Sequence, residues 1–140
     1  MPTIQKPCPD CGQMATFKFG EAIHNDRLAW FATHHCDYCN YRVEIDDYGH
    51  LPDELKRIVL KEEGQWQLVL HAFGTNKIAT LKELREILGL SVQDLAELLT
   101  QLPGTIAIGT RNEVDYLKSH LLTVLDETEM EISYLDNLRE

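Results

Sequence analysis

Long apolar runs are missing from this sequence of 140 residues. No stretch approaches the roughly 20 apolar residues that a membrane-spanning helix needs, so we expect no membrane association. No export signal or lipidation motif is visible at the N-terminus, which predicts a cytoplasmic protein. Phosphate-binding loops, a nucleophile elbow and the H-E-x-x-H pattern are also missing, so the sequence gives no support to an enzyme.

Basic side chains are the second shortage. The chain has 13 Lys and Arg against 23 Asp and Glu, for a formal net charge of -10. Nucleic-acid affinity depends on neutralising phosphates with Lys and Arg. The composition therefore disfavours nucleic acid as a partner, without excluding a local basic patch.

Cysteine occurs at few positions, and these follow a regular pattern. The four cysteines form two C-x-x-C pairs with 24 residues between them: Cys8 and Cys11, then Cys36 and Cys39. Four thiolates can close a tetrahedral shell around one zinc and leave no open position for a substrate. Gly12 and Asn40 follow the two pairs, and both residue types readily adopt the left-handed conformation that turns backbone amides toward sulfur. We expect one structural Zn²⁺; rubredoxin-type iron and disulfides are the alternatives.

Residues 1–48 have the pattern of a zinc ribbon. Three short strands are expected at 15–23, 28–34 and 41–46, with a turn at 24–27. Strands this short enclose little core, so the metal must supply much of the folding free energy.

Residues 49–64 predict a connector helix. Proline and two acids open it at Pro52, and Gly64 ends it. Its apolar stripe of Leu55, Ile58 and Val59 must pack on another element.

Residues 65–140 have a different hydrophobic pattern, which predicts both strands and helices. Strands are expected at 66–73, 105–108 and 130–134, and helical periodicity at 78–88, after Ser91 and after Thr110, where two capping boxes begin. The predicted fold class is α+β: an N-terminal β zinc ribbon followed by a small β-α-α-β-α-β domain with its helices on one face of the sheet.

Residues 66–132, about half the chain, resemble the C-terminal domain of the acidic stalk protein of the large bacterial ribosomal subunit. The match follows the family's glycine, lysine, arginine and proline landmarks in order: Gly74-Thr75-Asn76-Lys77-Ile78-Ala79, Lys82, Arg85, Gly89-Leu90, Pro103-Gly104-Thr105 and Gly109.

The resemblance implies a domain that is no enzyme and whose first-helix face recruits translational GTPases, including elongation factors Tu and G. It assigns this role to six residues: Lys77, Ile78, Ala79, Leu81, Lys82 and Arg85. The helical spacing of Ile78, Lys82 and Arg85 places them on one face independently. In the alternative interpretation, Ile78 and Leu81 belong to the core and the cations are simply solvated.

The sequence also departs from that family. Residues 91–96 lack the lysines of the family's second helix, and a ribbon replaces its dimerisation and ribosome-anchoring helices. We expect an interaction protein that docks a translation- or ribosome-linked partner. One alternative is a ribbon that binds nucleic acid or transcription machinery, with Trp30, Phe31, Tyr38 and Tyr41 as stacking candidates. A redox module of rubredoxin type is another.

Overall fold

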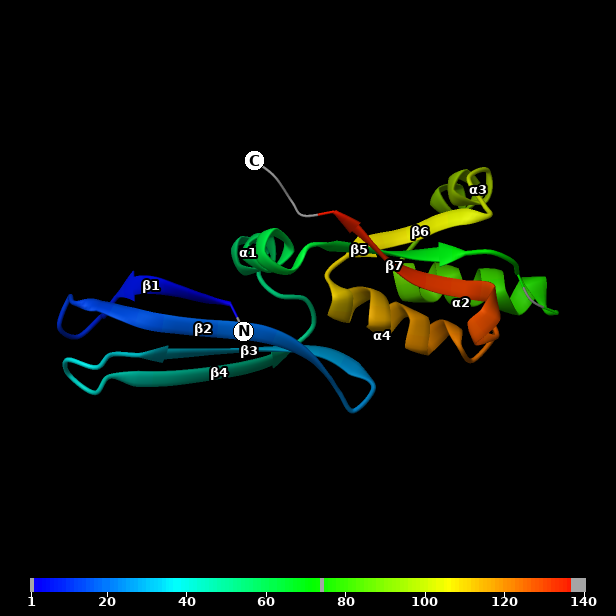
Figure 1. Ribbon diagram of the computed structural model, residues 1–140. Helices are drawn as coiled ribbons and strands as arrows, with labels where there is room; N and C mark the ends of the chain where they lie inside the picture. The colour runs from blue at the N-terminus through cyan, green and yellow to red at the C-terminus, as the bar shows by residue number, and fades with distance from the viewer. Residues whose placement is uncertain (1, 74, 137–140) are drawn as a thin grey trace.

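Two antiparallel sheets follow one another along the chain in the computed structural model, which describes residues 2–73 and 75–136 (Figure 1). The first has the strand order β1-β2-β3-β4 and the second β6-β5-β7. The elements are β1 (Thr3–Pro7), β2 (Met14–His24), β3 (Arg27–His35), β4 (Arg42–Tyr48), α1 (Asp53–Glu63), β5 (Gln65–Leu70), α2 (Lys77–Leu88), α3 (Val92–Leu99), β6 (Gly104–Gly109), α4 (Arg111–Leu121), the 3-10 turn η1 (Glu127–Glu129) and β7 (Met130–Asp136). The predicted α+β class is confirmed.

The first sheet has four strands where the sequence predicted three. The missed strand, β1, pairs antiparallel with β2 from Thr3 opposite Lys18 to Pro7 opposite Met14. It is an edge strand, the position in which a sheet tolerates proline. Only Ile4 in β1 packs against the apolar cluster beneath the sheet, so the strand carries almost no alternating pattern.

Helix α1 covers one face of this first sheet. Its buried Leu55 and Val59 pack with Phe19 of β2 and Ala32 of β3. The apolar stripe of the predicted connector therefore lies against the ribbon strands. Gly64 ends the helix with φ of 88°, and its N–H bonds the carbonyl of Leu60, as the sequence predicted.

The second sheet has one apolar and one polar face. Leu68 and Leu70 of β5 lie in a buried cluster with residues of α2 and α4, which lie on the same side of the sheet in Figure 1. The other face carries a row of hydrogen bonds across all three strands: Thr105 Oγ1 donates to Gln67 Oε1 at 2.7 Å, and Gln67 Nε2 donates to Ser133 Oγ at 3.1 Å. The alternation of apolar and polar residues along β5 produces this division.

Both predicted capping boxes are present. Ser91 and Asp94 cap α3, and Thr110 and Glu113 cap α4, each pair with reciprocal side-chain and backbone hydrogen bonds. Helix α2 begins at Lys77, because the side chain of Asn76 accepts a hydrogen bond from the Ala79 amide at 3.0 Å.

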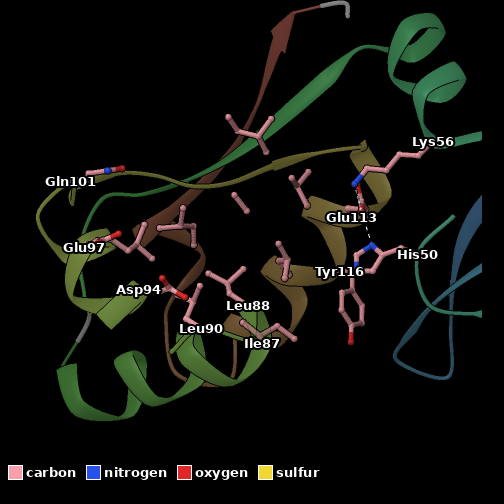
Figure 2. Close-up of a pocket in the computed structure, with 16 residues that line it drawn as sticks. His50, Lys56, Ile87, Leu88, Leu90, Asp94, Glu97, Gln101, Glu113 and Tyr116 are labelled. Atoms are coloured by element: carbon pink, nitrogen blue, oxygen red, sulfur yellow. Dashed lines mark hydrogen bonds and ion pairs between the residues drawn. The ribbon is translucent and has the colours of Figure 1, made fainter. Parts of the chain in front are cut away.

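The cap of α4 also joins the two halves of the chain. Glu113 is buried, and its Oε2 lies 2.6 Å from His50 Nδ1 and 3.0 Å from Lys56 Nζ. Figure 2 marks both contacts with dashed lines. Burial raises the pKa of this carboxyl, but the Thr110 amide, Lys56 and His50 together hold it below its usual value. A buried ionised carboxylate is tolerated only with such partners, so this contact links α4 to the 50–56 segment.

A second carboxyl faces this junction from β2. Both oxygens of Glu21 are buried and lack a hydrogen-bond partner among the described residues. Burial raises the pKa of Glu21; the Thr110 hydroxyl opposes the rise without reaching normal hydrogen-bond geometry, and the charge of Glu113 adds to it. Its ionised form therefore destabilises the junction.

We predict that Glu21→Gln stabilises the protein at neutral pH. Because the folded state raises this pKa, Glu21 favours folding when protonated, and that stability is lost as pH rises from about 4.3 through the higher folded-state value. The variant should exceed the parent by about 1 kcal/mol at pH 8, because its neutral amide removes the desolvated charge beside Glu113. The difference should shrink toward pH 5.

Urea unfolding of the metal-loaded chain, followed by circular dichroism, measures this difference. The matched control is Glu62→Gln, because Glu62 is exposed at the end of α1. An advantage of Glu21→Gln that is the same at pH 5 and pH 8 would contradict the assignment.

Candidate metal centre and helix face

The four cysteines lie in two turns at the same end of the first sheet. Cys8 and Cys11 lie between β1 and β2, and Cys36 and Cys39 lie between β3 and β4. Because β2 and β3 pair with Thr16 opposite His35, the two turns are side by side. The strand pairing thus brings together two sequence motifs that are far apart in the chain.

The sulfur atoms form a compact cage. All four lie within 4.8 Å of one another, with Cys8 and Cys39 3.5 Å apart and Cys11 and Cys36 3.6 Å apart. A tetrahedral shell with bonds of about 2.3 Å places neighbouring sulfurs about 3.8 Å apart. The four thiols are free, and a disulfide would need a separation of about 2.05 Å. The cage therefore fits one ion held by all four sulfurs.

The two turns have the same backbone design. Gly12 and Asn40 have φ of 78° and 62°, which confirms the expected left-handed conformations. Their amides donate to the carbonyls of Cys8 at 3.0 Å and Cys36 at 3.1 Å, respectively. The repeated geometry leaves later amides free to point at sulfur.

Backbone amides that point at the sulfurs lower the thiol pKa values, whereas desolvation raises them. Desolvation raises the pKa of Cys8, but the amides of Cys11 and Asp10 lower it by more, so that the pKa falls to about 7. The Tyr41 amide lowers the pKa of Cys39, but desolvation and the other three cysteines outweigh it and raise the value to about 12. Four thiolates this close repel one another unless a cation lies between them, and four sulfur donors select a thiophilic metal such as zinc or iron.

The metal-binding role of the four cysteines stays a prediction, but their surroundings suit a structural site. Cys8 and Cys36 are buried with Ala15, and the half-buried Tyr41 packs against them. The inner half of the cage is thus shielded by the sheet, whereas Cys11 and Cys39 lie at the surface.

The four aromatic stacking candidates do not form one surface. Trp30 packs with the cluster beneath α1, and Tyr41 packs against the cysteines. Phe31 points to the opposite face of the sheet, where its ring covers Gly20 so closely that a Cβ there would lie 2.8 Å from it. Tyr38, 73% exposed, is the most accessible of the four. This scatter gives little support to a base-stacking platform.

The six residues assigned by the resemblance lie at the start and along one side of α2. Ile78 is 81% exposed, and Lys77, Lys82 and Arg85 are also exposed. Ala79 and Leu81 are half-buried, while Thr80 and Leu84 form the buried side of the helix. Ile78 is therefore not a core residue, and the alternative interpretation is wrong for that position. Whether this face binds a partner stays a prediction.

Two side chains of this face have fixed surroundings. Lys77 Nζ lies 5.1 Å from the ring centroid of Phe73, and Arg85 Nε donates to the carbonyl of Leu90 at 3.3 Å. Lys82 lies between them on the exposed side of the helix.

Fold and site together define an α+β chain with a tetracysteine β unit and a second unit of β-α-α-β-α-β order. No protein-family model matches the chain. A C-terminal part is similar to large ribosomal subunit protein bL12 from three bacteria, which confirms the stalk-like resemblance.

The protein from Azobacteroides pseudotrichonymphae genomovar. CFP2 is 34% identical over 64 residues, which is 45% of this chain and 52% of that protein. The one from Alkalilimnicola ehrlichii is 32% identical over 62 residues, covering 44% and 50%. The one from Alcanivorax borkumensis is 30% identical over 61 residues, covering 43% and 49%. The chain thus spans about half the length of the curated relatives it matches.

Within the described ranges, the helices are too short and too polar to cross a bilayer.

We predict that removing one cysteine pair abolishes metal binding. Cys36→Ser combined with Cys39→Ser leaves two sulfur ligands, so affinity should fall by far more than the roughly 10- to 100-fold typical of losing an outer-shell partner. Elemental analysis of reduced, purified protein should give one metal ion per chain for the parent and none for the variant.

Asp10→Asn is the control, because it changes an exposed side chain within the first C-x-x-C pair and keeps all four sulfurs. Stoichiometric metal in the double variant would show that the ion is held elsewhere.

Proposed function

We propose that this chain is a cytoplasmic, non-enzymatic zinc-binding interaction protein whose stalk-like unit docks a translation- or ribosome-linked protein. Residues 1–48 act as the zinc ribbon, 49–64 as its connector helix and 65–140 as the docking domain. The observation that carries the proposal is the similarity to the ribosomal protein together with the exposed, cation-flanked Ile78 of α2.

Zinc is the metal we assign to Cys8, Cys11, Cys36 and Cys39. A shell closed by four thiolates has no position for water or substrate, which is the arrangement of structural zinc sites. Bound zinc would offset half of the charge of the four thiolates and tie the two turns together. Iron would colour the purified protein, whereas a colourless protein with one zinc per chain supports the assignment.

The partner would contact Lys77, Ile78, Ala79, Leu81, Lys82 and Arg85. An isoleucine this exposed costs solvation free energy unless something covers it, and α2 presents it beside three cations on a chain with net charge of -10. The complementary surface is an apolar cleft bordered by carboxylates. The half-buried Leu81 and Ala79 would form the edge of the contact.

Translational GTPases are the partner class that the resemblance favours. Helix α3 lacks basic residues, so contacts on this side would depend on α2 alone. The proposed contact surface is therefore smaller and carries fewer basic residues than that of the stalk family. It would suit a different ribosome-associated protein as well as a GTPase.

We predict that Lys82→Glu combined with Arg85→Glu weakens partner binding at least about tenfold, because 1.4 kcal/mol corresponds to tenfold and two reversed charges at the contact exceed that. Purified elongation factors Tu and G and isolated ribosomes are the partners to test by biolayer interferometry.

The matched control is Lys18→Glu with Arg42→Glu, the same charge change on the exposed side of the first sheet. Unchanged binding by the α2 variant, or equal losses by both variants, would rule out this face as the docking site.

A further inference from the structure

Helix α3 uses its apolar side incompletely. Helices α1, α2 and α4 each bury at least two residues, whereas α3 buries none. Leu95 and Leu98 only border the main core, and Val92 is 65% exposed. Most helices in proteins are stabilised by burying an amphipathic face. Part of the α3 face therefore lacks a protein covering among the described residues.

A groove lies beside α3 on the side of the helix that carries Asp94, Glu97 and Leu98; the exposed Val92 does not line it. It has a volume of about 640 Å³ and is enclosed by α3, the C-terminal end of α2, β6 and α4 (Figure 2). We call it the α3–β6 groove. Its apolar lining includes Leu88, Leu98, Ile106, Ala107 and Leu117. The volume lies within the roughly 300–1,000 Å³ range of ligand pockets, which suits a few side chains and not a whole helix pair.

Strand β6 forms one apolar wall of the groove and contains a β-bulge. Leu68 and Val69 of β5 pair with Ala107 and Thr105, so Ile106 is an extra residue in β6. Ile106, Ala107 and Ile108 all line the groove, and the small Ala107 leaves space there. Because β6 is an edge strand, no further strand within residues 2–73 and 75–136 covers this side.

The charges around the groove are unequal. Asp94 and Glu97 of α3 lie on one side in Figure 2, and His50, Lys56 and Glu113 lie on the other. Glu113 is already paired with Lys56 and His50. Asp94 accepts a hydrogen bond only from its own cap residue, and neither Asp94 nor Glu97 makes an ion pair in the described part of the chain. The uncompensated charge is therefore negative.

We propose that the α3–β6 groove binds a short peptide segment of a protein partner that carries apolar anchors beside Lys or Arg. The anchors would cover the half-buried Leu98 and Ala107 and the exposed Ile108, all of which line the groove. The cations would pair with Asp94 and Glu97 at the rim. The groove is separate from the proposed docking face, because Lys77, Ile78, Lys82 and Arg85 do not line it.

Fluorescence anisotropy with the full, metal-loaded chain tests this inference. The probe is a labelled ten-residue peptide with three leucines and three lysines separated by glycine and serine. Two comparison peptides replace the leucines by serine or the lysines by glutamate. The leucine–lysine peptide should bind at least about tenfold more tightly than either, a difference of 1.4 kcal/mol.

Four variants locate the binding. Glu97→Lys should weaken the leucine–lysine peptide at least about tenfold, and Ala107→Leu, which fills the groove, should do the same. The control Glu86→Lys makes the same charge change on an exposed residue of α2 outside the groove and should bind normally. Lys82→Glu with Arg85→Glu should also keep the peptide, which separates this inference from the proposed function.

Several results would overturn the inference. If the peptide with serine in place of leucine bound as tightly as the leucine–lysine peptide, apolar anchors would play no part in binding. If the peptide with glutamate in place of lysine bound more tightly, the groove would not select cations. Equal losses for Glu86→Lys and Glu97→Lys would reduce the effect to overall charge. Self-association of the chain that Ala107→Leu abolishes would assign the groove to a second copy instead.

Discussion

The crowding of four cysteine sulfurs at one end of the first sheet is the constraint on which the rest of this unit depends. Apart from the cysteines, the buried cluster there contains only Ala15, with Tyr41 at its edge. At the other end, α1 supplies Leu55 and Val59 as an apolar cover. The sheet thus has two supports, one electrostatic and one hydrophobic. Without a cation the four thiolates repel one another, because they are desolvated and adjacent, and this end of the sheet is destabilised.

The junction between the two units rests on a different balance of charge. Glu113 caps α4 and accepts contacts from His50 and Lys56, which belong to the segment that follows the first sheet. Glu21 faces the same place; its carboxyl oxygens have no hydrogen bond of normal geometry among the described residues, and its ionised form weakens the junction. His50 and Lys56 also line one end of the α3–β6 groove. The 50–56 segment would therefore help to shape a binding surface on the stalk-like unit, and this gives a physical reason for joining the two units.

Local patterns predicted much of this structure, and long-range contacts account for what they missed. The C-x-x-C pairs, both capping boxes and the spacing of Ile78, Lys82 and Arg85 are each readable within a few residues. Strand β1 was missed because an edge strand with one apolar contact leaves no alternation. The Glu113–His50 contact joins residues 63 positions apart, and no local motif marks it. The groove is lined by residues from five separate segments, and its β6 wall contains a bulge at Ile106 that a hydrophobic pattern does not reveal.

The most direct test of the central claim is hydrogen–deuterium exchange of the intact, reduced chain before and after metal removal by a chelator. If the sulfur-bound ion organises the first sheet, amides in β1 to β4 should lose protection, whereas β5, β6 and β7 should keep theirs. Full protection of β1 to β4 in metal-free protein, with elemental analysis proving the metal absent, would contradict the account.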